Sequence, residues 1–197
     1  MNICFFCAAS DLEPRYTEPA VRLARMVAEA GHTLVWGGSD RGLMSDIARA
    51  AQAAGGEVLG ITMESLKQTA LESADRMIVA RDLAERKALM LEHSDAIVTL
   101  TGGTGTLDEF TELFELRRHG VHDKPLIILN TEGFYDGLLT QWQRMADDDF
   151  LDRLPRPLFE LVTMAETPEE VMALVEGELA VPQKILSTPL VFSNEAI

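Results

Sequence analysis

The 197-residue sequence is poor in cysteine, with two, and in basic side chains, with 17 lysines and arginines against 32 aspartates and glutamates. The formal net charge of −15 argues against nucleic-acid binding, which needs a concentrated basic surface. No apolar run approaches the ~20 residues of a membrane-spanning helix, and the N-terminus lacks the basic and apolar regions of a signal peptide. We therefore expect a soluble cytoplasmic protein with neither nucleic-acid nor membrane partners.

The two cysteines, Cys4 and Cys7, have the spacing Cys-x-x-Cys within an apolar segment that is predicted to be a strand. Side chains at positions i and i+3 of a strand point to opposite faces, whereas redox pairs with this spacing lie at the start of a helix. The spacing therefore favours neither a redox pair nor a metal site.

Segments typical of strands and of helices alternate along the chain, which indicates βαβ units around a parallel sheet. The length and the hydrophobic content of 47% fit one domain. We predict an α/β fold, a doubly wound parallel sheet of about seven strands with flanking helices, over residues 1–177, and a tail over 178–197. The predicted strands lie near 2–7, 33–36, 57–62, 77–80, 95–100, 125–130 and 158–163, and the predicted helices near 17–30, 42–54, 82–93, 106–119, 135–147 and 167–177.

Two of these helices have end signals in the sequence. Thr17 is predicted to cap the N-terminus of the first helix, and Gly31 lies just beyond its C-terminus. Thr167 is predicted to cap the last helix, with Pro168 at the first helical position and Glu170 completing a capping box.

The most informative segment joins the strand 95–100 to the helix 106–119 through a glycine-rich turn. Gly102, Gly103 and Gly105 allow a tight turn, and the first N–H groups of a helix beginning near Thr106 favour an anion. A dinucleotide fingerprint would need glycine where Asp108 stands, and no Gly-Lys-Ser/Thr follows for a Walker loop. We therefore expect this turn to bind one phosphate.

Ligands of open parallel sheets bind beyond the carboxyl ends of the strands. That edge is predicted to carry Ala8-Ala9-Ser10, the second glycine-rich loop Gly37–Gly42, Arg81-Asp82 and the Thr101–Gly105 turn. We expect the four loops to converge on one site, with Ser10 and Gly38 among its ligand-binding residues.

Three charged residues on two predicted helices are the candidates for chemistry. Glu109 lies at the border of an apolar stripe, next to the expected phosphate site. Thr106 and Glu109 also have the spacing of a capping box, in which Glu109 would only accept a backbone N–H. On helix 82–93, the predicted apolar stripe consists of Leu83, Ala84, Met90 and Leu91. Lys87 falls within this stripe and Arg86 at its edge, so these cations either extend to solvent or face a polar pocket.

Several segments together resemble the Lonely guy (LOG) family of phosphoribohydrolases, long labelled possible lysine decarboxylases. The spacing between the signature segments Glu85–Met90 and Gly102–Glu109 agrees with the family, and the resemblance covers roughly residues 1–175. Further matches are Ser94-Asp95-Ala96, Gly42-Leu43-Met44, His122-Asp123-Lys124-Pro125 and Phe134-Tyr135-Asp136.

The resemblance implies a Rossmann-like catalytic domain that hydrolyses the N-glycosidic bond of nucleoside 5′-monophosphates, either cytokinin ribotides or AMP. Arg86 and Glu109 would be catalytic and Lys87 would contact the substrate, because a carboxylate can stabilise an oxocarbenium-like ribose and direct water. The family also implies no metal or other cofactor, and a homodimer whose interface includes helix 82–93 or 106–119. The phosphate would be bound by Gly102, Gly103, Thr104, Gly105 and Thr106.

The chain departs from the family pattern at Thr101, where proline is usual, at Ala8-Ala9, where Gly-Ser is usual, and at Ser39, where glycine is usual. These departures leave the preferred base open. Two other functions also stay open. One is a non-catalytic nucleotide-binding protein similar to the molybdenum-cofactor carriers, and the other is a pyridoxal-phosphate decarboxylase with Lys87 as its Schiff-base lysine.

Overall fold

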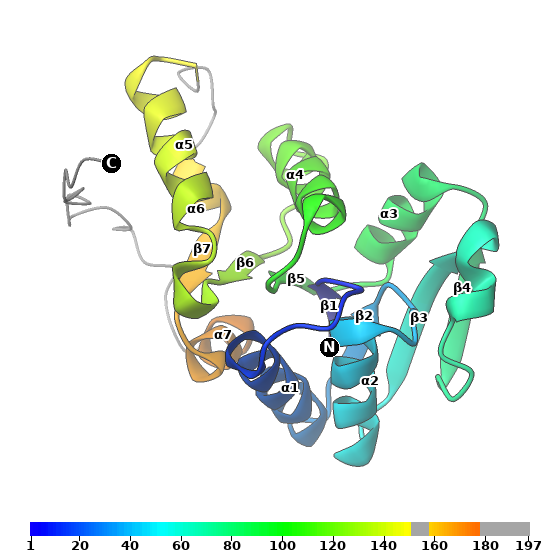
Figure 1. Cartoon of the computed structure of the whole chain (residues 1–197). Coiled ribbons are helices and arrows are strands. Elements are labelled where there is room, and N and C mark those ends of the chain that lie inside the picture. The colour runs from blue at the N-terminus through cyan, green and yellow to red at the C-terminus, as the bar shows by residue number, and fades with distance from the viewer. Residues whose placement is uncertain (151–157, 178–197) are drawn as a thin grey trace, which may run out of the picture.

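Seven parallel strands form one sheet, in the order β4-β3-β2-β1-β5-β6-β7, in the computed structural model, which describes residues 1–150 and 158–177 (Figure 1). The order reverses at β1, so the chain extends the sheet first in one direction and then, from β5, in the other. This confirms the predicted doubly wound, Rossmann-like fold. The strands are β1 (Asn2–Phe6), β2 (Thr33–Trp36), β3 (Val58–Met63), β4 (Arg76–Ala80), β5 (Ala96–Thr99), β6 (Leu126–Leu129) and β7 (Thr163–Ala165).

Helices cover both faces of the sheet, which explains why most strands are apolar on both sides. In β1, Ile3 and Phe5 face a core cluster shared with α1, α2 and α7, whereas Cys4 and Phe6 face a cluster shared with α3, α4 and α5. Figure 1 shows these two sets of helices on opposite sides of the sheet. The helices are α1 (Pro14–Glu29), α2 (Gly42–Ala53), α3 (Leu83–Glu92), α4 (Thr104–Arg118), α5 (Asp136–Asp147), α6 (Leu158–Leu161) and α7 (Pro168–Val175), with 3-10 helices η1 (Glu64–Thr69) and η2 (Thr131–Gly133).

Six of the predicted strands are confirmed to within one residue at each end, and the seventh is misplaced. The prediction gave a strand at 158–163, but residues 158–161 form the short helix α6 and β7 begins at Thr163. A short apolar run fits a buried strand or a buried helical turn equally well, so its periodicity does not distinguish them. The predicted tail over 178–197 lies outside the described residues.

The helix ends follow the sequence signals in two cases and contradict them in a third. Gly31 follows α1 with a φ of +74°, and Thr167 caps α7 by accepting the Glu170 N–H over 3.2 Å, as predicted. The prediction that Thr17 caps α1 is wrong, because the helix begins at Pro14 and Thr17 lies inside it. Proline at the first helical position starts the helix one turn earlier.

Within the described ranges, no helix is both long and apolar enough to span a membrane.

Candidate active site

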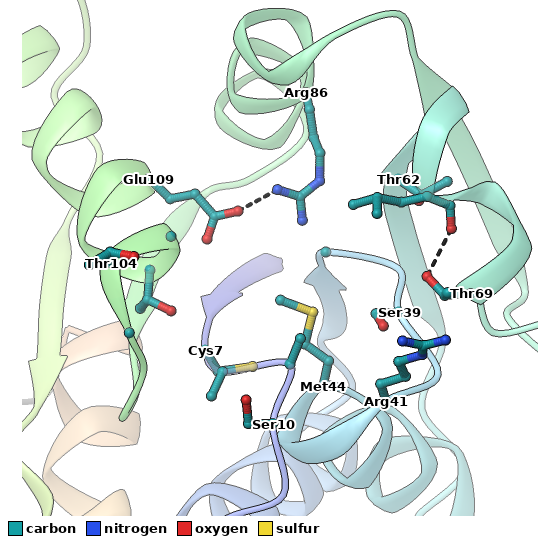
Figure 2. Close-up of a pocket in the computed structure, with 17 residues that line it drawn as sticks. Cys7, Ser10, Ser39, Arg41, Met44, Thr62, Thr69, Arg86, Thr104 and Glu109 are labelled. Atoms are coloured by element: carbon teal, nitrogen blue, oxygen red, sulfur yellow. Dashed lines mark hydrogen bonds and ion pairs between the residues drawn. The ribbon is translucent and has the colours of Figure 1, made fainter.

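A cavity of about 440 Å³ lies at the carboxyl-end edge of the sheet, beside the reversal of strand order between β1 and β5. Open α/β sheets bind ligands at this point, and the volume falls in the range of ~300–1,000 Å³ typical of small-molecule sites. Figure 2 shows side chains from α3, α4, η1 and the loops after β1 and β2 around one space. The lining residues are Cys7, Ala8, Ala9, Ser10, Gly37, Ser39, Arg41, Met44, Thr62, Leu66, Thr69, Arg86, Gly103, Thr104, Gly105, Thr106 and Glu109.

The N-terminus of α4 presents free backbone N–H groups at this cavity. The Leu107 N–H closes the first helical turn by donating to the Gly103 carbonyl over 3.1 Å. The N–H groups of residues 104–106 make no hydrogen bond within the described part of the chain. Free N–H groups at the positive end of a helix dipole favour an anion. The geometry of this turn therefore suits a phosphate.

The second glycine-rich loop has the opposite arrangement. The first N–H groups of α2 are already bonded, because Leu43 donates to the Ser10 carbonyl over 3.1 Å and Met44 to the Ala8 carbonyl over 3.2 Å. Gly42 has a φ of +51°, and a Cβ at this position would lie 2.3 Å from the Ser10 carbonyl oxygen. This loop therefore packs against the loop after β1, and its N–H groups are less available for an anion than those of α4.

Two glycines that were predicted to bind ligand lie behind the cavity wall. A Cβ on Gly102 would lie 2.1 Å from Thr106 Oγ1, so glycine is needed for the close packing of this turn. Gly38 has a φ of +76° and packs against Met77 and Thr62. Both shape the wall without lining it. The predicted residues that do line the cavity are Ser10, Gly103, Thr104, Gly105, Thr106, Arg86 and Glu109.

Arg86 of α3 and Glu109 of α4 form a buried ion pair in the cavity wall (Figure 2). Arg86 Nη1 donates to Glu109 Oε1 over 2.5 Å, and each residue is 6% exposed. Arg86 Nε donates to the carbonyl of Ile61, which lies within β3, over 2.8 Å. A Cβ on Gly37 would lie 2.2 Å from Arg86 Nη2, so only glycine leaves room for the guanidinium. The pair is therefore fixed by three elements.

The structure excludes one of the two predicted roles of Glu109. The helix begins at Thr104 with Gly103 at the N-cap position, so Thr106 and Glu109 do not form a capping box, and that alternative is wrong. The carboxylate accepts from a guanidinium instead. Burial raises the pKa of Glu109 above its ordinary value, and the Arg86 cation opposes this rise. The site thus holds a carboxylate that is more basic than one on the surface.

Lys87 is buried beside Arg86 but does not line the cavity. Its Nζ donates to Asp108 Oδ2 over 2.9 Å and forms an ion pair with Glu112. Burial lowers the pKa of this ammonium, but the Glu112 and Asp108 carboxylates outweigh burial and raise it overall. A Schiff-base lysine must be neutral and must face the reactant, so this environment argues against a pyridoxal-phosphate site at Lys87.

The buried face of α3 differs from the predicted one. Leu83 and Ala84 were placed on an apolar stripe, but both are exposed, and Arg86, Lys87 and Met90 are the buried residues of this helix. The two cations therefore do not extend to solvent. Hydrophobic periodicity could not predict this, because the partners of both cations lie on α4.

The cysteines lie as the spacing predicts, on opposite faces of the sheet. Both are buried free thiols, and Cys7 lines the cavity. Burial raises the pKa of both thiols, so both stay protonated and are poor nucleophiles.

One wall of the cavity was not predicted from the sequence. It contains Thr62 at the end of β3, Leu66 and Thr69 on η1, Met44 on α2, and Arg41 before α2. The segment that forms η1 has no clear helical or strand periodicity, which explains why it was missed. Arg41 could have been found, because it lies within the glycine-rich loop that was expected at this edge.

A cavity and a buried arginine–glutamate pair lie at the switch point of this doubly wound sheet, an arrangement typical of α/β proteins that bind a small ligand at this edge. The model of the family described as "Possible lysine decarboxylase" matches residues 44–175. The cytokinin riboside 5′-monophosphate phosphoribohydrolase LOG5 of Arabidopsis thaliana is 38% identical over 161 residues, which are 80% of this chain and 71% of that protein. The cytokinin riboside 5′-monophosphate phosphoribohydrolase of Mycobacterium marinum is 34% identical over 154 residues, 77% of this chain and 82% of that protein. The chain therefore belongs to the LOG family, as the sequence predicted.

Solved structures share the fold at lower identity. The molybdenum cofactor binding protein from Rippkaea orientalis superposes with a TM-score of 0.66 at 22% identity, covering 90% of this chain and 94% of that chain. The molybdenum cofactor carrier protein from Chlamydomonas reinhardtii has a TM-score of 0.66 at 21% identity, covering 89% of this chain and 96% of that chain. At this identity the likeness shows the fold alone.

Proposed function

We propose that this protein hydrolyses the N-glycosidic bond of a nucleoside 5′-monophosphate, such as AMP or a cytokinin ribotide, to the free base and ribose 5-phosphate. The observation that carries the proposal is the buried Arg86–Glu109 pair, which shares one cavity with the free N–H groups of residues 104–106. Relatives at 34–38% identity are named phosphoribohydrolases, which supports the same reaction class here.

The free N–H groups at the start of α4 would bind the 5′-phosphate. A phosphate gains from both the hydrogen bonds and the helix dipole, and the cavity-lining Thr104 and Thr106 side chains add hydroxyl donors. With the phosphate there, the ribose lies toward Glu109, which is on the second turn of the same helix.

Glu109 would then stabilise the ribose as the C1′–N bond breaks. The bond electrons leave with the base, and C1′ acquires oxocarbenium character that a nearby carboxylate stabilises. A water adds to C1′ and gives its proton to Glu109, whose raised pKa suits a general base. The departing base takes up one proton, which Glu109 can return, so the base leaves as the neutral free base and the carboxylate is restored. Arg86 Nη1 and Nε bind Glu109 and Ile61, so its Nη2 group remains for the ribose hydroxyls or the phosphate.

Lys87 was expected to contact the substrate, but its position supports a different role. Its ion pairs with Asp108 and Glu112 connect α3 to α4 beside the Arg86–Glu109 pair. Arg86 and Glu109 are the chain neighbours of Lys87 and Asp108. We therefore propose that Lys87 positions the pair and does not touch the nucleotide.

The homodimer implied by the family is also a proposal. Leu83 of α3 is 53% exposed and Val79 of β4 is 38% exposed, so this side of the molecule presents apolar surface next to α3. An interface that includes α3 would cover both side chains. Light scattering at micromolar concentration should give twice the chain mass, and Leu83→Glu should shift the mass toward the monomer.

Product analysis tests the proposed activity against a binding protein without catalysis. The protein is incubated with AMP, and adenine and ribose 5-phosphate are quantified by chromatography. Hydrolysis predicts equal amounts of both products, increasing with time and enzyme concentration. Tight binding of AMP without either product would contradict the proposal and would favour the carrier function suggested by the fold neighbours.

A further inference from the structure

Arg41 is a cation in the cavity that the proposed reaction does not use. It follows β2, precedes α2 and lines the cavity, and Figure 2 shows it beside Ser39, on the side away from Thr104. Its side chain makes no hydrogen bond or ion pair within the described residues. A free guanidinium at a cavity in a chain of net charge −15 is a candidate for ligand recognition.

The neighbouring carboxylate does not neutralise Arg41. Asp40 accepts from Ser45 Oγ over 2.6 Å and from Arg49 Nη2 over 2.7 Å, and these two partners lower the pKa of its carboxyl. Glu109 is the only carboxylate among the described residues that line the cavity, and it is paired with Arg86. The charge of Arg41 is therefore free to act on a ligand.

The proposed orientation of the substrate places its base on the same side as Arg41. With the phosphate at the N-terminus of α4 and C1′ near Glu109, the base extends toward the remaining wall, which contains Met44, Thr62, Leu66 and Thr69. The threonines of this wall can donate or accept hydrogen bonds, whereas a guanidinium can only donate. With Arg41 beside it, this wall is therefore better suited to a base edge that carries hydrogen-bond acceptors than to one that carries donors.

We infer, on the basis of the proposed function, that Arg41 selects 6-oxopurine nucleotides, IMP and GMP, over AMP. The N7 and O6 atoms of a 6-oxopurine are adjacent acceptors that match the two-pronged guanidinium, whereas adenine presents N7 next to an amino donor. A bidentate contact of this kind discriminates between bases by about 5- to 150-fold. The amino group of adenine meets an arginine that cannot accept its hydrogen bond.

The test compares kcat/KM for IMP, GMP and AMP in the wild-type protein and in Arg41→Met, which keeps a long side chain without donors. Arg41 is exposed and makes no capping hydrogen bond, so the variant should fold. We expect the wild type to prefer IMP and GMP by at least about 5-fold. Arg41→Met should lower kcat/KM for those two nucleotides and leave AMP within about 2-fold. The matched control is Arg25→Met, which removes an exposed charge from α1 and should leave the preference unchanged.

Inhibition by ribose 5-phosphate separates base recognition from phosphate binding, because this product has no base. Its inhibition constant should be the same in the wild type and in Arg41→Met. A wild type without preference for IMP and GMP, an equal loss for all three nucleotides, or weaker inhibition by ribose 5-phosphate would overturn the inference while leaving hydrolysis intact. If no nucleotide is hydrolysed, the proposed function is wrong. The dissociation constants of IMP and AMP, measured for the wild type and for Arg41→Met, then test whether Arg41 selects the base.

Discussion

Replacing Glu109 by glutamine tests the chemistry at the centre of the site. The amide keeps the shape of the side chain and can still accept from Arg86 Nη1, but it has no charge to stabilise an oxocarbenium ion and cannot take a proton from water. We expect kcat on AMP or IMP to fall by about 10²–10⁴. Free-base release measured by chromatography over several hours covers this range.

The structure also indicates how far Glu109→Gln should lower the free energy of unfolding. Breaking a buried ion pair by removing one charge costs about 3–5 kcal/mol. Here the Arg86 guanidinium keeps its bond to the Ile61 carbonyl and borders a cavity, so we expect a smaller loss of about 1–3 kcal/mol in the free energy of unfolding. A loss of this size leaves a domain of ordinary stability folded at the assay temperature.

The matched control is Glu115→Gln on the same helix. Glu115 is exposed and forms a surface ion pair with Arg118 at 2.6 Å, so its loss should change stability by less than about 1 kcal/mol and leave kcat unaffected. Circular dichroism establishes that both variants are folded. A folded Glu109→Gln protein that releases base at nearly the wild-type rate would refute the catalytic role of this carboxylate.

Three further measurements follow from the geometry. Burial raises the pKa of Glu109 above its ordinary value of 4.5, so the carboxylate becomes protonated at a higher pH than a surface glutamate does. The acid limb of the kcat/KM profile should therefore lie above pH 4.5. An acid limb at or below pH 4.5 would contradict the raised pKa. Gly37→Ala places a Cβ 2.2 Å from Arg86 Nη2 and should lower kcat by at least about 10-fold. Gly137→Ala in α5 places a Cβ that meets nothing within 4 Å among the described residues, so this variant should keep full activity. Thr101→Val removes a buried hydroxyl that has no hydrogen-bond partner in the described part of the chain, so urea unfolding should show equal or higher stability by up to about 1 kcal/mol. A loss of stability larger than that would mean that the hydroxyl is bonded.

Most of the fold was predictable because its strands are buried on both faces. Ile3 to Phe6 and Leu126 to Leu129 form continuous apolar runs, which are typical of strands in the middle of a sheet covered by helices. The misplaced last strand shows the limit of this reasoning, since its apolar run becomes the helix α6 before β7 begins. Local sequence does not contain the tertiary contacts that decide such cases.

The site was predictable where a local pattern carries the chemistry. The glycines at the start of α4 predict a tight turn into a helix N-terminus, and the N–H groups of residues 104–106 make no hydrogen bond among the described residues. The partners of Arg86, Glu109 and Lys87 were not predictable from periodicity, because each pair joins residues on two helices that are 21 to 25 positions apart in sequence. The wall with Leu66 and Thr69 required the position of η1, which only packing fixes.

The dependence of turnover on the 5′-phosphate tests the central claim most directly. Rates of free-base release are measured for AMP against adenosine and for IMP against inosine, under the same conditions. The N–H groups of residues 104–106 should bind only the phosphorylated substrates, and the loss of two or more charge-assisted hydrogen bonds predicts at least a ~100-fold lower kcat/KM for the nucleosides. Comparable kcat/KM values for nucleotide and nucleoside would contradict the phosphate site at α4 and the account built on it.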